Sequence, residues 1–137
     1  MNTRTQNGKQ YVLCAWRRRY VRLTPEEHVR QTILYALETN YGYPHGLIGV
    51  EVPIEVAGLK KRCDAIVYNQ QMQPLMLIEF KAETVPLTQQ VFDQTAIYNR
   101  HLQVPYLMLS NGKDTIVAEV LPTEYRFLAY IPNYQEL

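Results

Sequence analysis

Hydrophobic positions recur at helical spacing near the start of the chain. Val29, Ile33 and Leu37 are each four residues apart, which places them on one face of a helix. The sequence predicts a helix over residues 25–38. It ends before the Asn-Tyr-Gly-Tyr-Pro segment at residues 40–44, because glycine and proline interrupt helical patterns.

Shorter hydrophobic runs follow and are typical of strands. Pro53 favours an edge or a bulge in the first of them, since proline cannot donate to a strand ladder. Asn111-Gly112 marks a hairpin. The predicted order is α-β-β-β-α-β-β with one more strand at the C-terminal end, which indicates an α/β fold with a mixed β-sheet flanked by helices. The expected strands are 47–56, 63–68, 75–81, 106–109, 115–120 and 125–131, and the second expected helix is 87–102.

Length and composition are those of one globular domain. The chain has 137 residues, of which 47% are hydrophobic and 20% charged, and domains typically contain about 100–150 residues. Its apolar runs are far shorter than the roughly 20 residues of a membrane span, so we expect no membrane partner. The polar N-terminus and the two cysteines, without a disulfide framework, indicate a cytoplasmic protein.

The first 22 residues carry an unusual concentration of positive charge. They contain six basic residues and no acidic one, although the net charge of the whole chain is only +1. Trp16 and Tyr20 lie among these cations, a composition that suits contact with phosphates and bases; a solvated basic surface is the alternative. We therefore divide the chain into a basic N-terminal arm, 1–22, and a single domain, 23–137. The expected nucleic-acid contacts in the arm are Arg17, Arg18 and Arg19.

Two carboxylates and a lysine form the most informative pattern. Glu79 and Lys81 alternate with Phe80, so they share one face of the third predicted strand. If Tyr68 opposes Leu75 across the intervening turn, Asp64 lies directly opposite Glu79. Opposed carboxylates repel each other, and Mg²⁺, with Mn²⁺ as a substitute, is a cation that such oxygens bind well. The alternative is a surface ion pair between Glu79 and Lys81 beside a solvated Asp64.

Blocks of residues around this pattern resemble the N-terminal nuclease-like domain of type I restriction enzyme R subunits, within the PD-(D/E)xK superfamily. The resemblance extends over about residues 17–120 and implies a restriction-endonuclease-like fold with Mg²⁺-dependent DNA cleavage. It implies Asp64 and Glu79 as metal ligands, the Phe80 carbonyl as a third, and Lys81 at the catalytic water. The chain departs from the family at Phe80 and at Glu83. The blocks are Thr24–Gln31, Gly42–Pro44, Lys61–Asp64, Leu77–Ala82, Gln94, Tyr98–Asn99 and Ser110–Gly112.

Other residues are candidates for supporting roles. At about 100° per residue, Glu26 lies near Ile33 on the predicted buried stripe, whereas Glu27 lies off its edge. We therefore expect Glu26 in the site and Glu27 in a capping box with Thr24; a first-turn acid facing the helix dipole is the alternative for Glu26. Gln94 and Tyr98 share a flank of the second helix, and the family's helix glutamine implies that they reach the scissile phosphate; residues at the edge of the core are the alternative. Arg62, at the start of the second predicted strand, is a further candidate for phosphate contact; a solvated side chain is the alternative.

Other reaction classes lack their residues. Ser110 is the only serine, two cysteines without spaced histidines do not form a structural zinc site, and no glycine-rich phosphate loop is present. The expected function is a Mg²⁺-dependent endonuclease-like domain that hydrolyses DNA phosphodiester bonds in restriction, defence or repair, as a homodimer or in a larger restriction-type complex. A resolvase-type nuclease acting as a dimer is one rival. A catalytically silent DNA-binding or subunit-interaction module with the same fold is the other.

Overall fold

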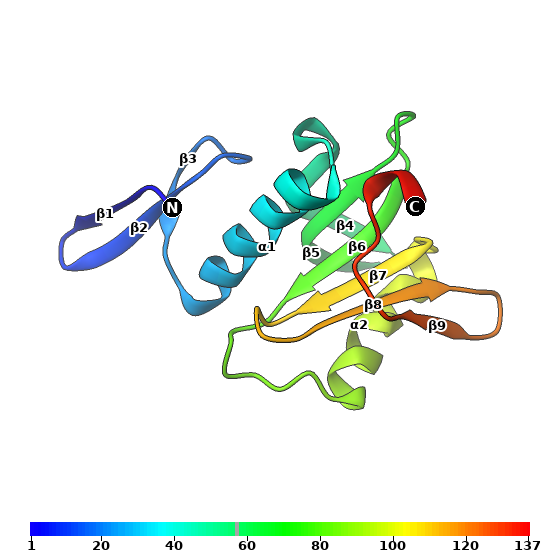
Figure 1. The fold of residues 1–137 in the computed structure, drawn as a ribbon. Helices are drawn as coiled ribbons and strands as arrows, with labels where there is room; N and C mark the ends of the chain where they lie inside the picture. The colour runs from blue at the N-terminus through cyan, green and yellow to red at the C-terminus, as the bar shows by residue number, and fades with distance from the viewer. Residues whose placement is uncertain (57) are drawn as a thin grey trace.

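A computed structural model describes residues 1–56 and 58–137 and shows that the basic N-terminal segment is folded. The segment forms an antiparallel sheet of β1 (Thr3–Gln6), β2 (Lys9–Cys14) and β3 (Arg19–Arg22). This sheet projects from the rest of the molecule beside the first helix (Figure 1). The sequence pattern predicted no strands here, because the strands are short and eight of the first ten residues are polar, which leaves no alternation of hydrophobic and polar positions.

The remaining strands form one mixed sheet whose spatial order equals the chain order. Its strands are antiparallel neighbours except for the parallel pair β6 and β7, which a crossover through the second helix joins, as parallel strands require. The predicted fold class, a mixed sheet flanked by helices, is confirmed. The strands are β4 (Ile48–Val56), β5 (Leu59–Tyr68), β6 (Pro74–Phe80), β7 (Tyr106–Ser110), β8 (Thr115–Val120) and β9 (Tyr125–Leu128).

Both main helices begin at threonine caps. In α1 (Pro25–Tyr41) the Thr24 hydroxyl accepts a hydrogen bond from the Glu27 N–H at 3.1 Å, and Thr88 caps α2 (Gln89–Leu102) in the same way. Helix α1 runs three residues past its predicted end and stops at Gly42, whose φ of 72° suits glycine. Short 3₁₀ turns follow at His45–Leu47 and Tyr134–Glu136. None of the helices in the described residues has the length and apolar character of a membrane span.

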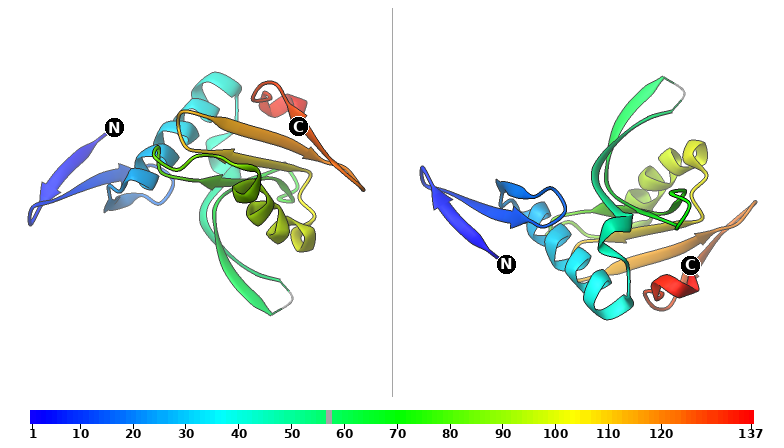
Figure 2. Two further views of the ribbon diagram at one scale, coloured as in Figure 1. Left: turned by 90° about the horizontal axis from the view of Figure 1, so that it is seen from below. Right: turned by 90° about the horizontal axis from the view of Figure 1, so that it is seen from above.

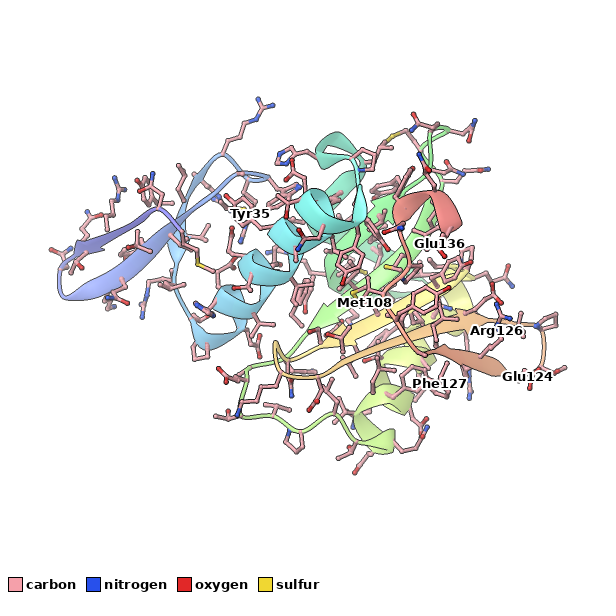
Figure 3. All side chains as sticks on the ribbon, viewed as in Figure 1. Tyr35, Met108, Glu124, Arg126, Phe127 and Glu136 are labelled. Atoms are coloured by element: carbon pink, nitrogen blue, oxygen red, sulfur yellow. The ribbon has the colours of Figure 1, made fainter. Side chains whose placement is uncertain are left out.

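The two helices cover opposite faces of the six-stranded sheet (Figure 2). Met76 and Ile78 of β6 pack in the core under α1, whereas Leu77 packs in the core under α2, as the alternation of side chains along a strand requires. Met108 is fully buried in the α1 core, while Phe127 lies exposed on the edge strand β9 (Figure 3). The sheet is therefore apolar on both faces.

The pairing of β5 with β6 fixes the geometry of the predicted site. Ala65 pairs with Ile78 in this ladder, and one further step in the same register places Asp64 across from Glu79. The assumed pairing of Tyr68 with Leu75 is wrong, because Tyr68 pairs with Pro74 after a register shift. The irregularity lies at the turn, so it leaves the register at the site end unchanged.

Candidate active site

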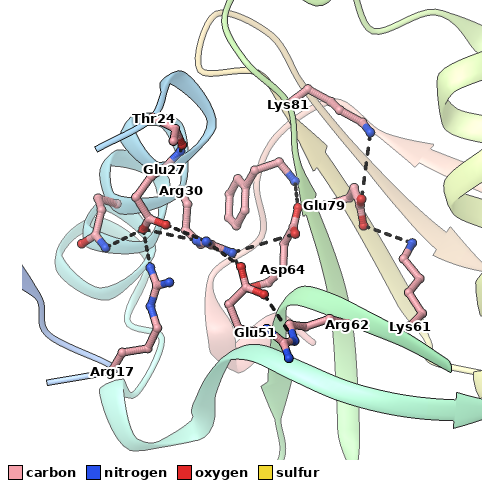
Figure 4. Close-up of polar contacts among 12 residues, drawn as sticks. Arg17, Thr24, Glu27, Arg30, Glu51, Lys61, Arg62, Asp64, Glu79 and Lys81 are labelled. Carbon is pink, nitrogen blue, oxygen red and sulfur yellow. Dashed lines mark hydrogen bonds and ion pairs between the residues drawn. The ribbon is translucent and has the colours of Figure 1, made fainter. Parts of the chain in front are cut away.

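The candidate site lies at the carboxyl end of β6, between α1 and α2 (Figure 4). Asp64 comes from β5, Glu79 from β6, and Lys81 follows directly after β6. The Phe80 N–H donates a hydrogen bond to Asp64 Oδ2 at 2.8 Å, and Lys81 Nζ lies 4.0 Å from Glu79 Oε1. The structure thus brings together the two carboxylates and the lysine that the sequence singled out.

The environment of Asp64 disfavours its charge. Burial, followed by the negative charge of Glu79, raises the pKa of Asp64 to about 6, although the Phe80 N–H and Arg30 act in the opposite direction. A raised carboxylate pKa means that the surroundings disfavour the ionised form, here mainly because burial removes its hydration. A bound cation would supply the positive charge that stabilises the ionised form of Asp64, which Arg30 and the Phe80 N–H do only in part.

Two lysines flank Glu79. Lys61 Nζ lies 3.5 Å from Glu79 Oε2, on the other side of the carboxylate from Lys81. Even so, Glu79 Oε2 is buried without a hydrogen-bond partner among the described residues. Sequence reasoning missed Lys61; the available signal was strand alternation, which puts Lys61 on the same face as Cys63, and Cys63 faces the α2 core.

Helix α2 provides one wall of a pocket at Glu79. Gln94 and Tyr98 line this pocket together with Lys61, Glu79 and Lys81. Lys61 Nζ also lies 3.6 Å from the centre of the Tyr98 ring, a cation–π contact. The expected common flank of Gln94 and Tyr98 therefore faces the site, and their contact with a phosphate stays a prediction.

The expected position of Glu26 is wrong. Glu26 is exposed, whereas Glu27 is only 4% exposed. The helical angles were measured from Ile33, but Ile33 is half-buried and the buried face of α1 is centred near Leu34. A reference at Leu34 places Glu27, seven residues earlier, on the buried stripe.

Glu27 lies in a dense set of hydrogen bonds instead of a capping box. Arg30 Nη2 donates to Glu27 Oε1 at 2.6 Å, and Arg17 Nη2 and Gln31 Nε2 donate to Glu27 Oε2. Burial alone would raise the pKa of Glu27, but the hydrogen bonds from Arg30, Arg17 and Gln31 outweigh it and lower the pKa to about 2. Glu27 is therefore ionised at neutral pH, and its hydrogen bonds give it a structural role.

Arg30 connects this network to the site. Its Nη1 donates to the Asp64 carbonyl at 3.3 Å and lies 3.9 Å from Asp64 Oδ1, while Nη2 lies 2.8 Å from Glu51 Oε1. Glu51 has a φ of 56°, and the β4–β5 ladder passes from the Val50–Ala65 pair to the Val52–Cys63 pair without pairing Glu51. Neither Arg30 nor Glu51 was predicted as a site residue. The sequence does indicate a contact between Arg30 and Glu27, because residues three apart are neighbours on a helix.

The predicted basic contacts fall into two groups. Arg62 extends at the rim with a 68% exposed side chain and lies 3.8 Å from Glu51. Arg18 directly precedes β3 and Arg19 begins it, and both are exposed. Arg17 differs, because its side chain is 13% exposed and bound to Glu27. In this conformation Arg17 is not free to contact another molecule.

The donor atoms suit a hard divalent cation. Within the described residues no group of three His, Cys, Asp or Glu side chains could enclose a metal ion, but Mg²⁺ commonly uses one or two carboxylates and keeps several waters. Asp64 and Glu79 supply such a pair, and Glu79 Oε2 is buried without a donor. The Phe80 side chain is buried in the α1 core, so its bulk does not fill the space between the carboxylates.

Comparison with known proteins assigns the family. The family model for the type I restriction enzyme R protein N terminus matches residues 25–132. The chain belongs to this family. The match begins at α1 and includes the whole six-stranded sheet, so the resemblance inferred from the sequence is confirmed, and β1–β3 lie outside the matched range.

A solved structure shares the fold of this R-protein N-terminal family member. It is a fragment of an HsdR subunit assigned to a type I restriction enzyme from Vibrio vulnificus YJ016, with a TM-score of 0.65 and 19% sequence identity. The similarity covers 84% of this chain and 24% of that chain. No curated protein matches the chain.

Proposed function

We propose that the chain is a Mg²⁺-dependent endonuclease domain that hydrolyses DNA phosphodiester bonds. The observation that carries this proposal is the opposition of Asp64, within β5, and Glu79, near the carboxyl end of β6, with Lys81 Nζ 4.0 Å from Glu79. Membership of a restriction-enzyme subunit family supports a nuclease-type domain. Mn²⁺ is expected to substitute for Mg²⁺, because it accepts the same oxygen ligands.

Asp64, Glu79 and the Phe80 carbonyl would hold the metal. When bound, the metal supplies Lewis-acid stabilisation of negative charge on the phosphoryl oxygens. Glu79 keeps one carboxylate oxygen near Lys81, which orients the ammonium group at the edge of the pocket. In this arrangement the protein holds two carboxylates and one cation around the place where a phosphate would enter.

Hydrolysis requires attack by water on phosphorus and departure of one sugar oxygen, which takes up a proton. Lys81 would hold the attacking water or stabilise the charge that develops on the phosphate, as positioned cations do. Gln94 and Tyr98 line the same pocket from α2, and Arg62 lies at the rim. These three side chains would hold the DNA backbone in line with the site.

The larger assembly is also part of the proposal. The chain corresponds to about a quarter of the HsdR fragment that it resembles, and its family is that of a restriction-enzyme subunit, which favours work within a restriction-type complex. We place this complex in the cytoplasm. One such site cuts one strand, so a two-fold homodimer would place a second site on the other strand.

The test compares three variants in the presence of Mg²⁺ or Mn²⁺. Lys81→Ala should keep the rise in melting temperature that the metal produces, while the rate of DNA cleavage falls on the order of a hundredfold. Asp64→Ala should lose both, because it removes a ligand. Lys113→Ala, at a lysine with a 65% exposed side chain, is the control and should cleave like wild type.

A silent module is the second candidate, and the position of Lys61 favours it. Lys61 lies 3.5 Å from the Glu79 oxygen that a metal would use, so a lysine already supplies positive charge there. If wild-type protein binds duplex, single-stranded and branched DNA but leaves all three uncut with either metal, the nuclease proposal fails and the binding module replaces it.

A further inference from the structure

The three-stranded N-terminal sheet has two unlike faces. On one face Val12 and Cys14 are fully buried, and Cys14 accepts hydrogen bonds from Arg17, which in turn binds Glu27 of α1. This inner face is therefore fixed to α1. The other face points away from that contact.

The outer face carries cations with tyrosines between them. Arg4 and Arg22 are the cross-strand partners of Tyr11 on its two sides, so all three side chains lie on one face. The register also places Lys9 and Tyr20 on this face. Arg4 Cζ lies 3.9 Å from the centre of the Tyr20 ring, and Arg22 Cζ lies 6.0 Å from that of Tyr11.

No acidic side chain neutralises these cations. Residues 1–22 contain no Asp or Glu, and in the part of the chain that the structure describes, no carboxylate lies within ion-pair distance of Arg4, Lys9 or Arg22. All three are exposed. A row of unpaired cations with stacked aromatic rings complements a polyanion that has flat bases or sugar faces.

The N-terminal sheet also lies on the same side of the molecule as the candidate site. The N-terminal end of α1 and the carboxyl end of β6, where Asp64 and Glu79 lie, are directed toward the side from which β1–β3 project (Figures 1 and 2). A duplex lying along that side could contact the sheet while its backbone enters the site.

We propose that Arg4, Lys9 and Arg22, with Tyr11 and Tyr20, form a backbone-binding surface for duplex DNA, separate from the Asp64 and Glu79 site. The choice of duplex DNA rests on the proposed function; the surface itself rests on the unpaired charge. This surface replaces Arg17 as a DNA contact, because Arg17 is engaged by Glu27. It lies outside the residues that match the family model.

The test measures the affinity of the 137-residue chain for a labelled duplex by fluorescence anisotropy, in EDTA, between 50 and 200 mM salt. Each phosphate contact contributes a slope of about −0.9 to the plot of log affinity against log salt. The triple variant Arg4→Gln, Lys9→Gln, Arg22→Gln should therefore lose about 2.7 from the slope. Wild type would then lose roughly fortyfold more affinity than the variant over this range.

The matched control removes three cations elsewhere. Arg100→Gln, Lys113→Gln, Arg126→Gln makes the same change in net charge at exposed positions and should keep the wild-type slope within about one contact. Lys9→Gln alone, at an exposed residue beside the β1–β2 turn, should reduce the slope by about 0.9 and tests the surface even if the triple variant fails to fold.

Three results would overturn the inference. They are equal slopes for wild type and the Lys9→Gln protein, an equal loss in the control triple variant, or a change in oligomeric state without a change in DNA affinity, which would identify a second protein copy as the occupant. Because binding is measured without divalent metal, absence of cleavage has no bearing on the result. If wild-type protein shows the expected salt slope in EDTA but cleaves no DNA with Mg²⁺ or Mn²⁺, that result would count against the proposed function alone.

Discussion

Glu27 shows how a buried structural charge can be missed, because the helical angles favoured Glu26 for the site and left Glu27 to a capping box. Its carboxylate receives hydrogen bonds from Arg17, Arg30 and Gln31, and Arg30 then reaches Asp64 and Glu51. Its position on the buried face could be read from the sequence only with the right helical reference, Leu34. The hydrogen-bond partners of Glu27 could not all be predicted from the sequence, because Arg17 comes from the loop between β2 and β3.

Glu27→Gln should lower the free energy of unfolding by about 3–5 kcal/mol at pH 7, since it leaves buried guanidinium groups without their counter-charge. Urea unfolding measures the effect. Glu26→Gln, at the exposed neighbour, is the control and should change stability by less than about 0.5 kcal/mol.

The same residue predicts an acid transition. Because its folded pKa of about 2 lies below the ordinary value of 4.5, the ionised Glu27 stabilises the fold above pH 4.5, and this contribution is lost as the pH falls toward 2. The Glu27→Gln protein should lose less stability than wild type between pH 4.5 and 2. Equal acid sensitivity of the two proteins would contradict the network.

Ionisation of Asp64 affects the stability of the fold in the opposite direction to that of Glu27. Its folded pKa of about 6 lies above the ordinary 3.8, so the ionised form destabilises the fold above pH 6, and the penalty disappears as the pH falls below about 4. Asp64→Asn keeps an acceptor for the Phe80 N–H. Without metal it should stabilise the protein by on the order of 1–2 kcal/mol at pH 8.

Melting curves at pH 8 and pH 4 check this prediction. The gain from Asp64→Asn should vanish at pH 4, while Asp114→Asn, at an exposed aspartate, should show no gain at either pH. A destabilised Asp64→Asn protein at pH 8 would mean that Arg30 already compensates the charge.

At the scale of the elements, the sequence predicts best those features that depend on neighbouring residues alone, such as helix ends and strand alternation. The cap of α1 at Thr24 and the end of the helix at Gly42 both follow from residue type, and the strand alternation that joins Glu79 to Lys81 follows from the pleat. The β5–β6 ladder was predicted correctly at the site but not at the turn. The shift between Val67 and Tyr68 reflects how the tight turn before Pro74 closes, which no side-chain pattern reveals.

Gly42 provides an element-scale prediction. Its φ of 72° is unfavourable for other residues, and a Cβ there would meet no atom within 4 Å, so Gly42→Ala should cost about 1 kcal/mol from backbone strain alone. Gly46 has equal space without a positive φ, and Gly46→Ala should be nearly neutral. Chemical denaturation measures both, and equal effects would remove the assigned role of Gly42.

At the scale of the whole molecule, the segment interpreted as an arm is part of the folded structure. Its basic composition was visible in the sequence, but its inner contacts join residues far apart. Trp16 packs against Tyr35 of α1 and stacks on His45, with ring centres 5.4 Å and 4.7 Å apart. Such contacts give no periodic signal, because each partner lies in a different element.

Removal of residues 1–22 should therefore destabilise the domain as well as weaken its DNA binding. The deletion takes away Trp16 from α1 and Arg17 from Glu27, and the loss of a packed aromatic side chain alone typically costs about 3–5 kcal/mol when it is fully buried. Since Trp16 is half-buried, we expect a loss of about 2 kcal/mol or more. Urea unfolding of the truncated chain and of Trp16→Ala measures this loss.

The outer-face variant Arg4→Gln, Lys9→Gln, Arg22→Gln separates the two effects of the deletion. It should keep most of the wild-type stability because its side chains are exposed, yet lose DNA affinity as far as the truncated chain does. If the truncated chain and Trp16→Ala both unfold at the wild-type urea concentration, the N-terminal sheet is an appendage. The packing of Trp16 against Tyr35 and His45 would then contribute nothing to the stability of α1.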